Sequence, residues 1–98
     1  MRRQIIEEHS FSDAALNVGA QAIDRAMEPI IDALVRNPYG FPTVENDFVR
    51  FRYAITKRIG ANPPHAGVPP LVVIFTIDDD GTVRLRDVER ADLPYGEI

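Results

Sequence analysis

The chain has no cysteine and no tryptophan, and its two histidines, His9 and His65, lie far apart in the sequence. The lack of cysteine excludes disulfides, thiolate metal sites and a cysteine nucleophile. Neither histidine has a second histidine at metal-ligand spacing, and no zinc or phosphate-binding motif is present. We therefore expect no metal site and no cofactor.

The chain also has no long apolar run. No stretch approaches the roughly 18 apolar residues that a transmembrane helix needs. Residues 1–8 carry two arginines but lack the apolar segment of a secretory signal. With no cysteine and no signal, the expected location is the cytoplasm, without membrane attachment.

Length and charge indicate one acidic domain. The 98 residues, 45% apolar and 27% charged, fit a single domain over residues 1–98 with one modest core. The net charge of −4 disfavours long-range steering of nucleic acid. Arg50, Arg52, Lys57 and Arg58 form a local basic strip without an acidic residue. Such a strip can contact phosphate, but we favour the interpretation that these are solvent-facing charges on one side of a sheet.

The strongest structural signal is a β-hairpin over residues 71–89. Its two β-rich runs flank Asp78-Asp79-Asp80-Gly81, and an Asp-Gly turn is typical of hairpins. The first run is continuously apolar, as in a strand covered on both faces. The second run alternates, which predicts one face with Val83, Leu85 and, if the alternation continues, Asp87, and another with Arg84, Arg86 and Val88.

A second strand and a long helical segment precede this hairpin. Residues 49–56 alternate strictly between apolar and polar side chains, which predicts a half-buried strand with a basic outer face. Apolar residues recur at helical spacing over residues 11–34, and Ser10 with Asp13 forms a capping-box pattern. Gly19 and Pro29 both disfavour a helix interior. We favour one long bent segment, with a break near Gly19 as the alternative.

These elements predict the fold class. We expect an α+β protein in which a long bent N-terminal helical segment packs on a twisted antiparallel sheet of three to four strands. Residues 4–8 form either a first strand or a frayed arm. Tyr39 and Phe41 lie between prolines, and we favour a role in closing the end of the core over the alternative of a binding surface. Residues 60–70, rich in proline and glycine, form an exposed loop.

The order of these elements resembles that of the RelE/ParE superfamily, the small toxins of bacterial toxin–antitoxin pairs. The resemblance covers most of the chain and rests on element order and apolar positions. The residues that carry it are Arg36-Asn37-Pro38, Phe41-Pro42, residues 49–53 and residues 70–83.

The resemblance implies a helical layer on a twisted sheet and a cognate antitoxin as partner. Its target would be translation, through cleavage of ribosome-bound mRNA, or DNA gyrase. Cleaving members use arginine, lysine and often tyrosine to hold phosphate and stabilise charge on a leaving oxygen. The matching positions here are Arg50, Arg52, Arg84, Arg86 and Tyr95, with Lys57 and Arg58 at a strand end.

An alternative from another class is a non-catalytic interaction module, or an inactive toxin-like scaffold, that self-associates as a homodimer or binds a partner. This alternative predicts an exposed apolar patch around Tyr39, Phe41 and the proline-rich loop. The toxin hypothesis instead predicts that the four strand arginines share one open face of the sheet. Whether the chain is an enzyme stays open at this point.

Overall fold

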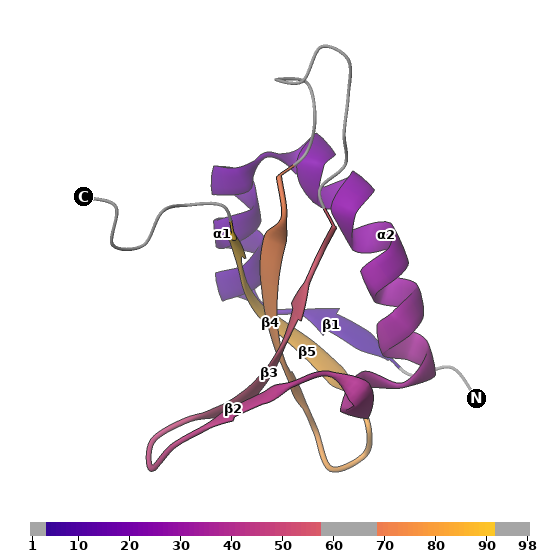
Figure 1. The fold of residues 1–98 in the computed structure, drawn as a ribbon, viewed down its shortest axis with the longest axis vertical. Helices are drawn as coiled ribbons and strands as arrows, with labels where there is room; N and C mark the ends of the chain where they lie inside the picture. The colour runs from indigo at the N-terminus through magenta and orange to yellow at the C-terminus, as the bar shows by residue number, and fades with distance from the viewer. Residues whose placement is uncertain (1–3, 58–68, 92–98) are drawn as a thin grey trace.

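The computed structural model describes residues 4–57 and 69–91 of the chain (Figure 1). Two α-helices and a short 3-10 turn combine with five strands, which makes the fold α+β. In chain order the elements are β1 (Ile5–Glu7), α1 (His9–Val18), α2 (Ala20–Arg36), η1 (Pro38–Gly40), β2 (Thr43–Glu45), β3 (Arg50–Ile55), β4 (Leu71–Ile77) and β5 (Val83–Arg90).

The sheet is mixed and has five strands in the order β1-β5-β4-β3-β2. The prediction of a purely antiparallel sheet with three to four strands is therefore wrong. β1 pairs with β5 in parallel, with Ile5 opposite Val83, whereas the other neighbouring strands are antiparallel. The two additional strands, β1 and β2, have three residues each and are too short to produce a periodic pattern.

The helical segment is broken at Gly19, so the favoured prediction of one bent helix is wrong and its alternative is correct. Gly19 adopts φ 113° and ψ 129°, a conformation that side-chain-bearing residues rarely adopt. Pro29, in contrast, lies inside α2 without ending it. Its position is exposed, so water can hydrogen-bond the carbonyl that proline leaves unpaired.

The predicted capping box at Ser10 is also wrong. Helix α1 already begins at His9, and its N-cap, Glu8, makes no side-chain capping hydrogen bond. The Ser10 hydroxyl instead donates to the backbone carbonyl of Arg86 on β5. This bond fixes α1 beside β5, beyond the point where β1 ends, and the Glu8 N–H donates to the Leu85 carbonyl at 3.0 Å. The outer edge of β5 is therefore covered by β1 along its first residues and by α1 further along.

The hydrophobic core lies between the helices and one face of the sheet, the core face. Its strand residues are fully or almost fully buried, as are Phe11 of α1 and Leu34 of α2. The strand residues of the core face are Ala54, Leu71, Val73, Phe75, Val83, Leu85 and Val88.

A β-bulge in the β4–β5 pair decides which β5 side chains face the core. The register shifts between Ile74 and Phe75, which face Asp87 and Leu85 respectively. Arg86 is the extra residue, and the shift returns Val88 to the core face, where it is 1% exposed. The predicted alternation, which placed Val88 with the arginines, is therefore wrong after Leu85.

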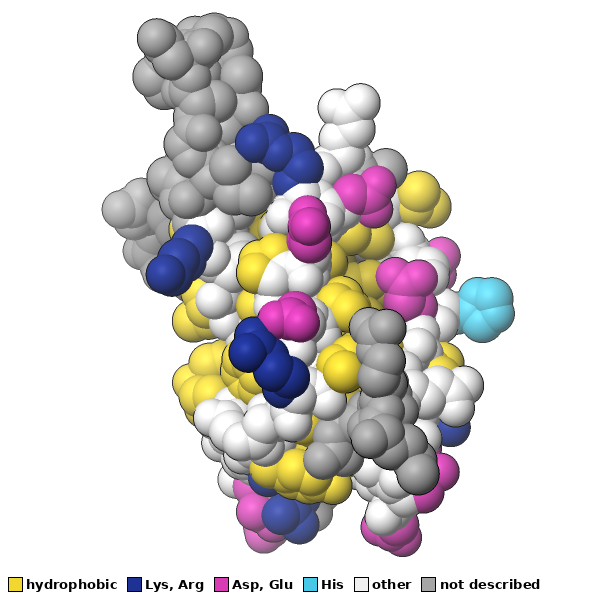
Figure 2. All heavy atoms as spheres, turned by 90° about the vertical axis from the view of Figure 1, so that its right-hand side faces the viewer, with side chains coloured by type: hydrophobic (Ala, Val, Ile, Leu, Met, Phe, Trp, Pro, Cys, Tyr) yellow, Lys and Arg dark blue, Asp and Glu magenta, His cyan; other side chains and the backbone are white. Residues whose placement is uncertain are grey.

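The outer side of α2 is charged. Figure 2 looks onto the side of the molecule where α2 lies and shows acidic and basic side chains with apolar side chains between them. Arg36 pairs with Asp32 one turn earlier on this surface. In the described residues, no helix combines the length and apolarity needed to cross a membrane.

Acidic or amide side chains accept hydrogen bonds in the turns of the β2–β3 and β4–β5 hairpins. At the predicted Asp-Gly turn, the Asp80 side chain accepts from the Thr82 N–H at 2.9 Å, the Gly81 N–H donates to the backbone carbonyl of Asp78 at 2.9 Å, and Gly81 adopts φ 88°. In the β2–β3 turn, the Asn46 side-chain oxygen accepts from the N–H groups of Phe48 and Val49 at 2.8 and 3.0 Å. Asn46 is therefore the sequence signal for a turn that the alternation of residues 49–56 does not reveal.

Candidate functional site

The face of the sheet opposite the core face carries apolar side chains, and no helix of residues 4–57 and 69–91 covers it; we call it the open face. The registers place Val44 of β2 opposite Phe51, and Tyr53 opposite Ile74 on this face. Each is exposed or half-buried. The apolar residues of the open face are Val44, Phe51, Tyr53, Ile55, Val72 and Ile74.

An uncovered sheet face is usually polar, which makes this composition informative. Ile55 is 58% exposed and Val44 is 38% exposed. The continuous apolar run of β4 predicts a strand that is covered on both faces, yet the described helices cover only one of them. Contiguous exposed apolar surface of this kind marks interaction sites in soluble proteins.

Charged side chains of both signs border the open face along β5. Arg84 lies opposite Thr76, and Asp87 lies opposite Ile74. Burial, more than the neighbouring charge of Glu89, raises the pKa of Asp87, although its hydrogen bond from the Val88 N–H opposes the shift. This border is chemically mixed and has no excess of basic charge.

Arg84 is held by two carboxylates. Its Nε donates to Asp78 at 2.8 Å and its terminal nitrogen donates to Glu8 at 2.9 Å. All three side chains are about one-third exposed. The hydrogen bonds from Arg84, first to Asp78 and then to Glu8, raise the pKa of Arg84 further above its ordinary value. The guanidinium ties β1 and the end of β4 to β5, so its charge is neutralised within the fold.

Arg86 lies next to this network and is more loosely held. Its Nε donates to the Thr76 hydroxyl at 2.9 Å, and a terminal nitrogen lies 3.6 Å from the Glu8 carboxylate. The Glu8 carboxylate is therefore shared between two arginines. Such a network stabilises the junction of β1, α1 and β5 rather than presenting unneutralised cations to a phosphate.

A cleft opens where the sheet forks. β3 pairs with β2 over Arg50–Arg52 and with β4 over Arg52–Ile55, so the two hairpins diverge beyond Arg52. Figure 1 shows this divergence, and the cleft between the hairpins has a volume of about 340 Å³. Its lining residues are Tyr39, Thr43, Arg50, Phe51, Arg52, Thr76, Ile77, Asp78 and Asp79.

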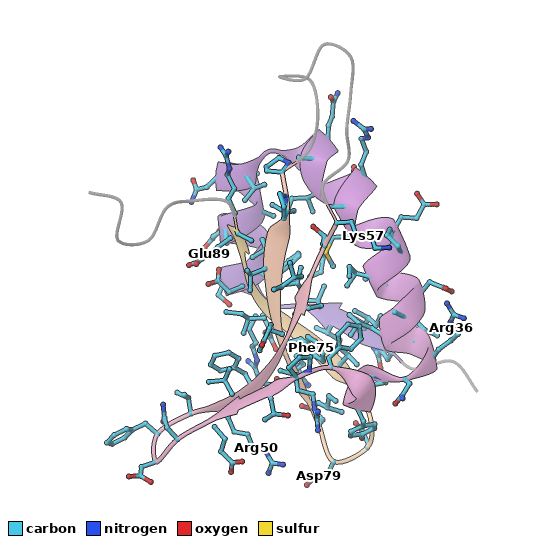
Figure 3. All side chains as sticks on the ribbon, viewed as in Figure 1. Arg36, Arg50, Lys57, Phe75, Asp79 and Glu89 are labelled. Carbon is cyan, nitrogen blue, oxygen red and sulfur yellow. The ribbon has the colours of Figure 1, made fainter. Side chains whose placement is uncertain are left out.

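Two arginines and two aspartates therefore line the same cleft. Arg50 is largely exposed, and its Nε lies 3.9 Å from the Glu45 carboxylate on β2. Figure 3 shows Arg50 and Asp79 at the same end of the molecule, on the two hairpins that flank the cleft. The acidic side chains offset the basic ones, so the cleft is bipolar rather than a cationic phosphate site.

Arg52 has a structural role in this cleft. One terminal nitrogen donates to the carbonyls of Tyr39 and Phe41 at 3.1 and 2.8 Å. Its guanidinium also lies 5.6 Å from the centre of the Tyr39 ring, a cation–π contact. Phe41 in turn packs edge-on against Phe75, with ring centres 5.6 Å apart. Phe41 thus plugs the end of the core, whereas Tyr39 stays 49% exposed.

The structure divides the predicted site residues between two faces of the sheet. Arg52, opposite Phe75, belongs to the core-face side, and Arg50 lies two residues before it on the same strand face. Arg84 and Arg86 bond to open-face partners on the other side. Tyr95 and Arg58 lie outside the described residues, and Lys57 is exposed just after β3.

The residues that sequence reasoning missed are the apolar side chains of the open face. The sequence places Tyr53 in a half-buried strand and Ile74 in a covered strand, and neither pattern predicts a functional role. The signal that identifies them is the continuous apolar run of β4, because the two helices in the described part of the chain cover only one face of the sheet. Within the described residues, no cluster of three or more His, Asp or Glu could bind a metal ion.

No family model matches this chain, and searches of the curated proteins and of the solved structures find no match.

Proposed function

We propose that this chain is a protein-binding module on a RelE/ParE-like scaffold, and that a protein partner covers the open face of its sheet. The observation that carries the proposal is the apolar open face formed by β2, β3 and β4. The partner would be a segment with an apolar stripe, such as an amphipathic helix, flanked by charges that match the mixed border on β5. If the chain acts as the RelE/ParE superfamily it resembles, this partner is the cognate antitoxin.

The arrangement of the arginines supports binding over catalysis. A site for phosphate cleavage needs several donors that converge on one reacting group. Here Arg84 is bonded to two carboxylates, Arg52 is bonded to two backbone carbonyls, and the two residues lie on opposite faces. Both guanidiniums are used within the fold, so neither is poised to stabilise a transition state.

Coexpression with the product of the adjacent reading frame tests this function. The partner should copurify with the unaltered chain and with Arg50→Ala, and Ile74→Glu should reduce copurification at least about tenfold because it places a charge in the apolar surface. Asp24→Ala, an exposed change on α2, is the matched control and should retain the partner. A partner that binds Ile74→Glu as well as the unaltered chain would contradict the proposal.

The second candidate is a toxin that acts on translation or on DNA gyrase through the cleft. The observation that favours it is that Arg50 and Arg52 line one cleft with Tyr39 and Thr76. Inducible expression in a bacterial host tests it, because growth arrest that is lost in Arg50→Ala but kept in the surface control Arg25→Ala would favour the toxin. Growth arrest that survives both Arg52→Ala and Arg84→Ala would place the toxic site elsewhere.

A further inference from the structure

The edge of the sheet formed by β2 is a second surface with unusual composition. Four of the exposed large apolar residues fall within eleven residues of sequence around this strand: Tyr39, Val44, Phe48 and Val49. Figure 1 shows the β2–β3 hairpin extending away from the helices. Phe48, at its tip, is 93% exposed. At the opposite edge of the sheet, in contrast, β1 and α1 cover β5.

The hydrogen-bond pattern determines which backbone groups of β2 point outward. The Tyr53 N–H donates to the Pro42 carbonyl at 3.1 Å, and the Asn46 N–H donates to the Val49 carbonyl at 2.9 Å. Because hydrogen-bonded pairs alternate along an antiparallel ladder, Val44 forms the hydrogen-bonded pair with Phe51. The N–H and C=O groups of Thr43 and Glu45 therefore point away from β3. Within residues 4–57 and 69–91, no other group hydrogen-bonds to them at this edge.

We propose that this edge pairs with the same edge of a second copy of the chain, in an antiparallel arrangement with its two-fold axis at Val44. In this register Thr43 of each copy lies opposite Glu45 of the other. The outward groups of both residues are then satisfied, with about four backbone hydrogen bonds across the interface. Pro42, which has no N–H, lies outside the paired segment.

The side chains are complementary in this register. On the open face, Val44 of one copy meets Val44 of the other, flanked on both sides by Phe51, so the apolar surface continues across the interface. On the other face, Glu45 of one copy stands between its own Arg50 and Thr43 of the second copy. No two charges of the same sign are directly opposed, as self-pairing of an edge requires.

The same register brings exposed aromatic residues of the two copies together. Counting outward from Val44, Asp47 at the hairpin tip of one copy comes alongside Phe41 of the second copy, the residue that follows η1. Phe48 is then brought next to the η1 turn of the second copy, where Tyr39 is half exposed. A two-fold axis makes this aromatic contact occur twice. Since aromatic anchors supply much of the affinity of interfaces, these two contacts would contribute most of the dimer's stability.

The proposed dimer uses the edge of the sheet and does not rest on the binding function proposed for the open face. Disulfide trapping tests it directly, because the chain has no native cysteine. Directly opposed residues of a non-hydrogen-bonded pair lie within reach of a disulfide. Val44→Cys should therefore form a covalent dimer under mild oxidation, seen on non-reducing gels. Ile55→Cys, on β3 away from this edge and 58% exposed, is the control and should stay monomeric on the same gel.

Light scattering on the unaltered chain completes the experiment. We expect a concentration-dependent dimer, with dissociation constants raised at least about tenfold by Phe48→Ala and by Val44→Lys, which opposes two lysines at the axis. Circular dichroism would establish that both variants are folded. A chain that stays monomeric at every accessible concentration would overturn the proposal. So would cross-linking of the Ile55→Cys variant as readily as the Val44→Cys variant, since the interface would then lie elsewhere.

Discussion

The β2–β3 and β4–β5 hairpins lie in opposite environments. The β4–β5 hairpin is built into the core, and Leu71, Val73, Phe75 and Val83 are all 0% exposed. The β2–β3 hairpin projects from the body, every residue of β2 is exposed, and Phe48 at its tip is 93% exposed. A turn motif therefore identifies a hairpin but does not tell how the hairpin is used.

The difference separates stability from recognition. Apolar burial stabilises a hairpin in proportion to the area removed from water, so β4 and β5 supply most of the stabilisation that the sheet provides. The β2–β3 hairpin contributes little burial and exposes apolar side chains instead. It is therefore the part of the sheet in which substitutions should alter interactions without unfolding the domain.

The largest expected effect contrasts two phenylalanines. Phe75→Ala should lower the free energy of unfolding by about 3–5 kcal/mol, because it leaves a cavity in the core and removes the partner of Phe41. Phe48→Ala should change it by less than about 0.5 kcal/mol in the monomer. Chemical denaturation at low protein concentration measures both. Similar losses of unfolding free energy for the two variants would mean that the two hairpins contribute equally to stability.

The next effect contrasts two arginines. Arg84→Ala should lower the free energy of unfolding at least about twice as much as Arg50→Ala, because it leaves Asp78 without this ion pair and Glu8 with only the longer contact to Arg86. Arg50→Ala should have only a small effect, since the pair of Arg50 with Glu45 is exposed and 3.9 Å long. Denaturation at low and high salt should show the Arg84 loss shrinking as salt increases. Equal losses for both variants would contradict the structural role of Arg84.

A smaller effect concerns the turn of the projecting hairpin. Asn46→Ala removes the acceptor of the Phe48 and Val49 N–H groups and should cost less than about 1 kcal/mol of global stability. Hydrogen exchange should accelerate at these two amides while the amides of β4 keep their protection. Faster exchange in β4 as well would show that the hairpin is coupled to the core.

The smallest effect is a pH dependence of opposite sign at two aspartates. Burial raises the pKa of Asp87 in the folded state, so its contribution to stability is present below its ordinary value of 3.8 and is lost as the pH rises through the raised pKa. Asp87→Asn should therefore stabilise the protein at pH 7 and have little effect at pH 3.

Asp80 is the matched control. Its hydrogen bond from the Thr82 N–H lowers the pKa of Asp80, so its contribution is present above 3.8 and is lost as the pH falls through the lowered pKa. Asp80→Asn should slightly destabilise the protein at pH 7 and have little effect at low pH. Thermal unfolding of both variants across pH 3–7 measures this contrast, and shifts of the same sign would contradict the assignment.

The sequence predicts the elements with strong periodicity and misses those that depend on tertiary contacts. The β4–β5 hairpin, its Asp-Gly turn and β3 are predicted because alternation and turn chemistry are local. The parallel pairing of β1 and the bulge at Arg86 depend on contacts between distant segments. The break at Gly19 is an open alternative in the sequence, because glycine is tolerated in many helices and only the observed φ of 113° distinguishes the two cases.

The candidate sites also separate into features with a local sequence signal and features that depend on tertiary contacts. Arginine is easily recognised in a sequence, but its partners are not: Arg52 bonds to carbonyls eleven and thirteen residues earlier in the chain, and Arg84 bonds to Glu8. The open face is present in the sequence as the apolar run of β4. Which of its side chains stay uncovered depends on where α1 and α2 pack.

The parallel pairing of β1 with β5 also has a consequence for the order of folding. β1 can join the sheet only after β5 has formed, because Ile5 pairs with Val83, which lies 78 residues later in the chain. During synthesis the helices and the β2–β3 hairpin can form early, while β1 has no partner until β5 is made. Pairings between such distant segments slow folding, because the intervening chain must lose entropy before the contact forms. Docking of β1 should therefore be a late event in folding, and truncation within β5 should leave the first strand unpaired.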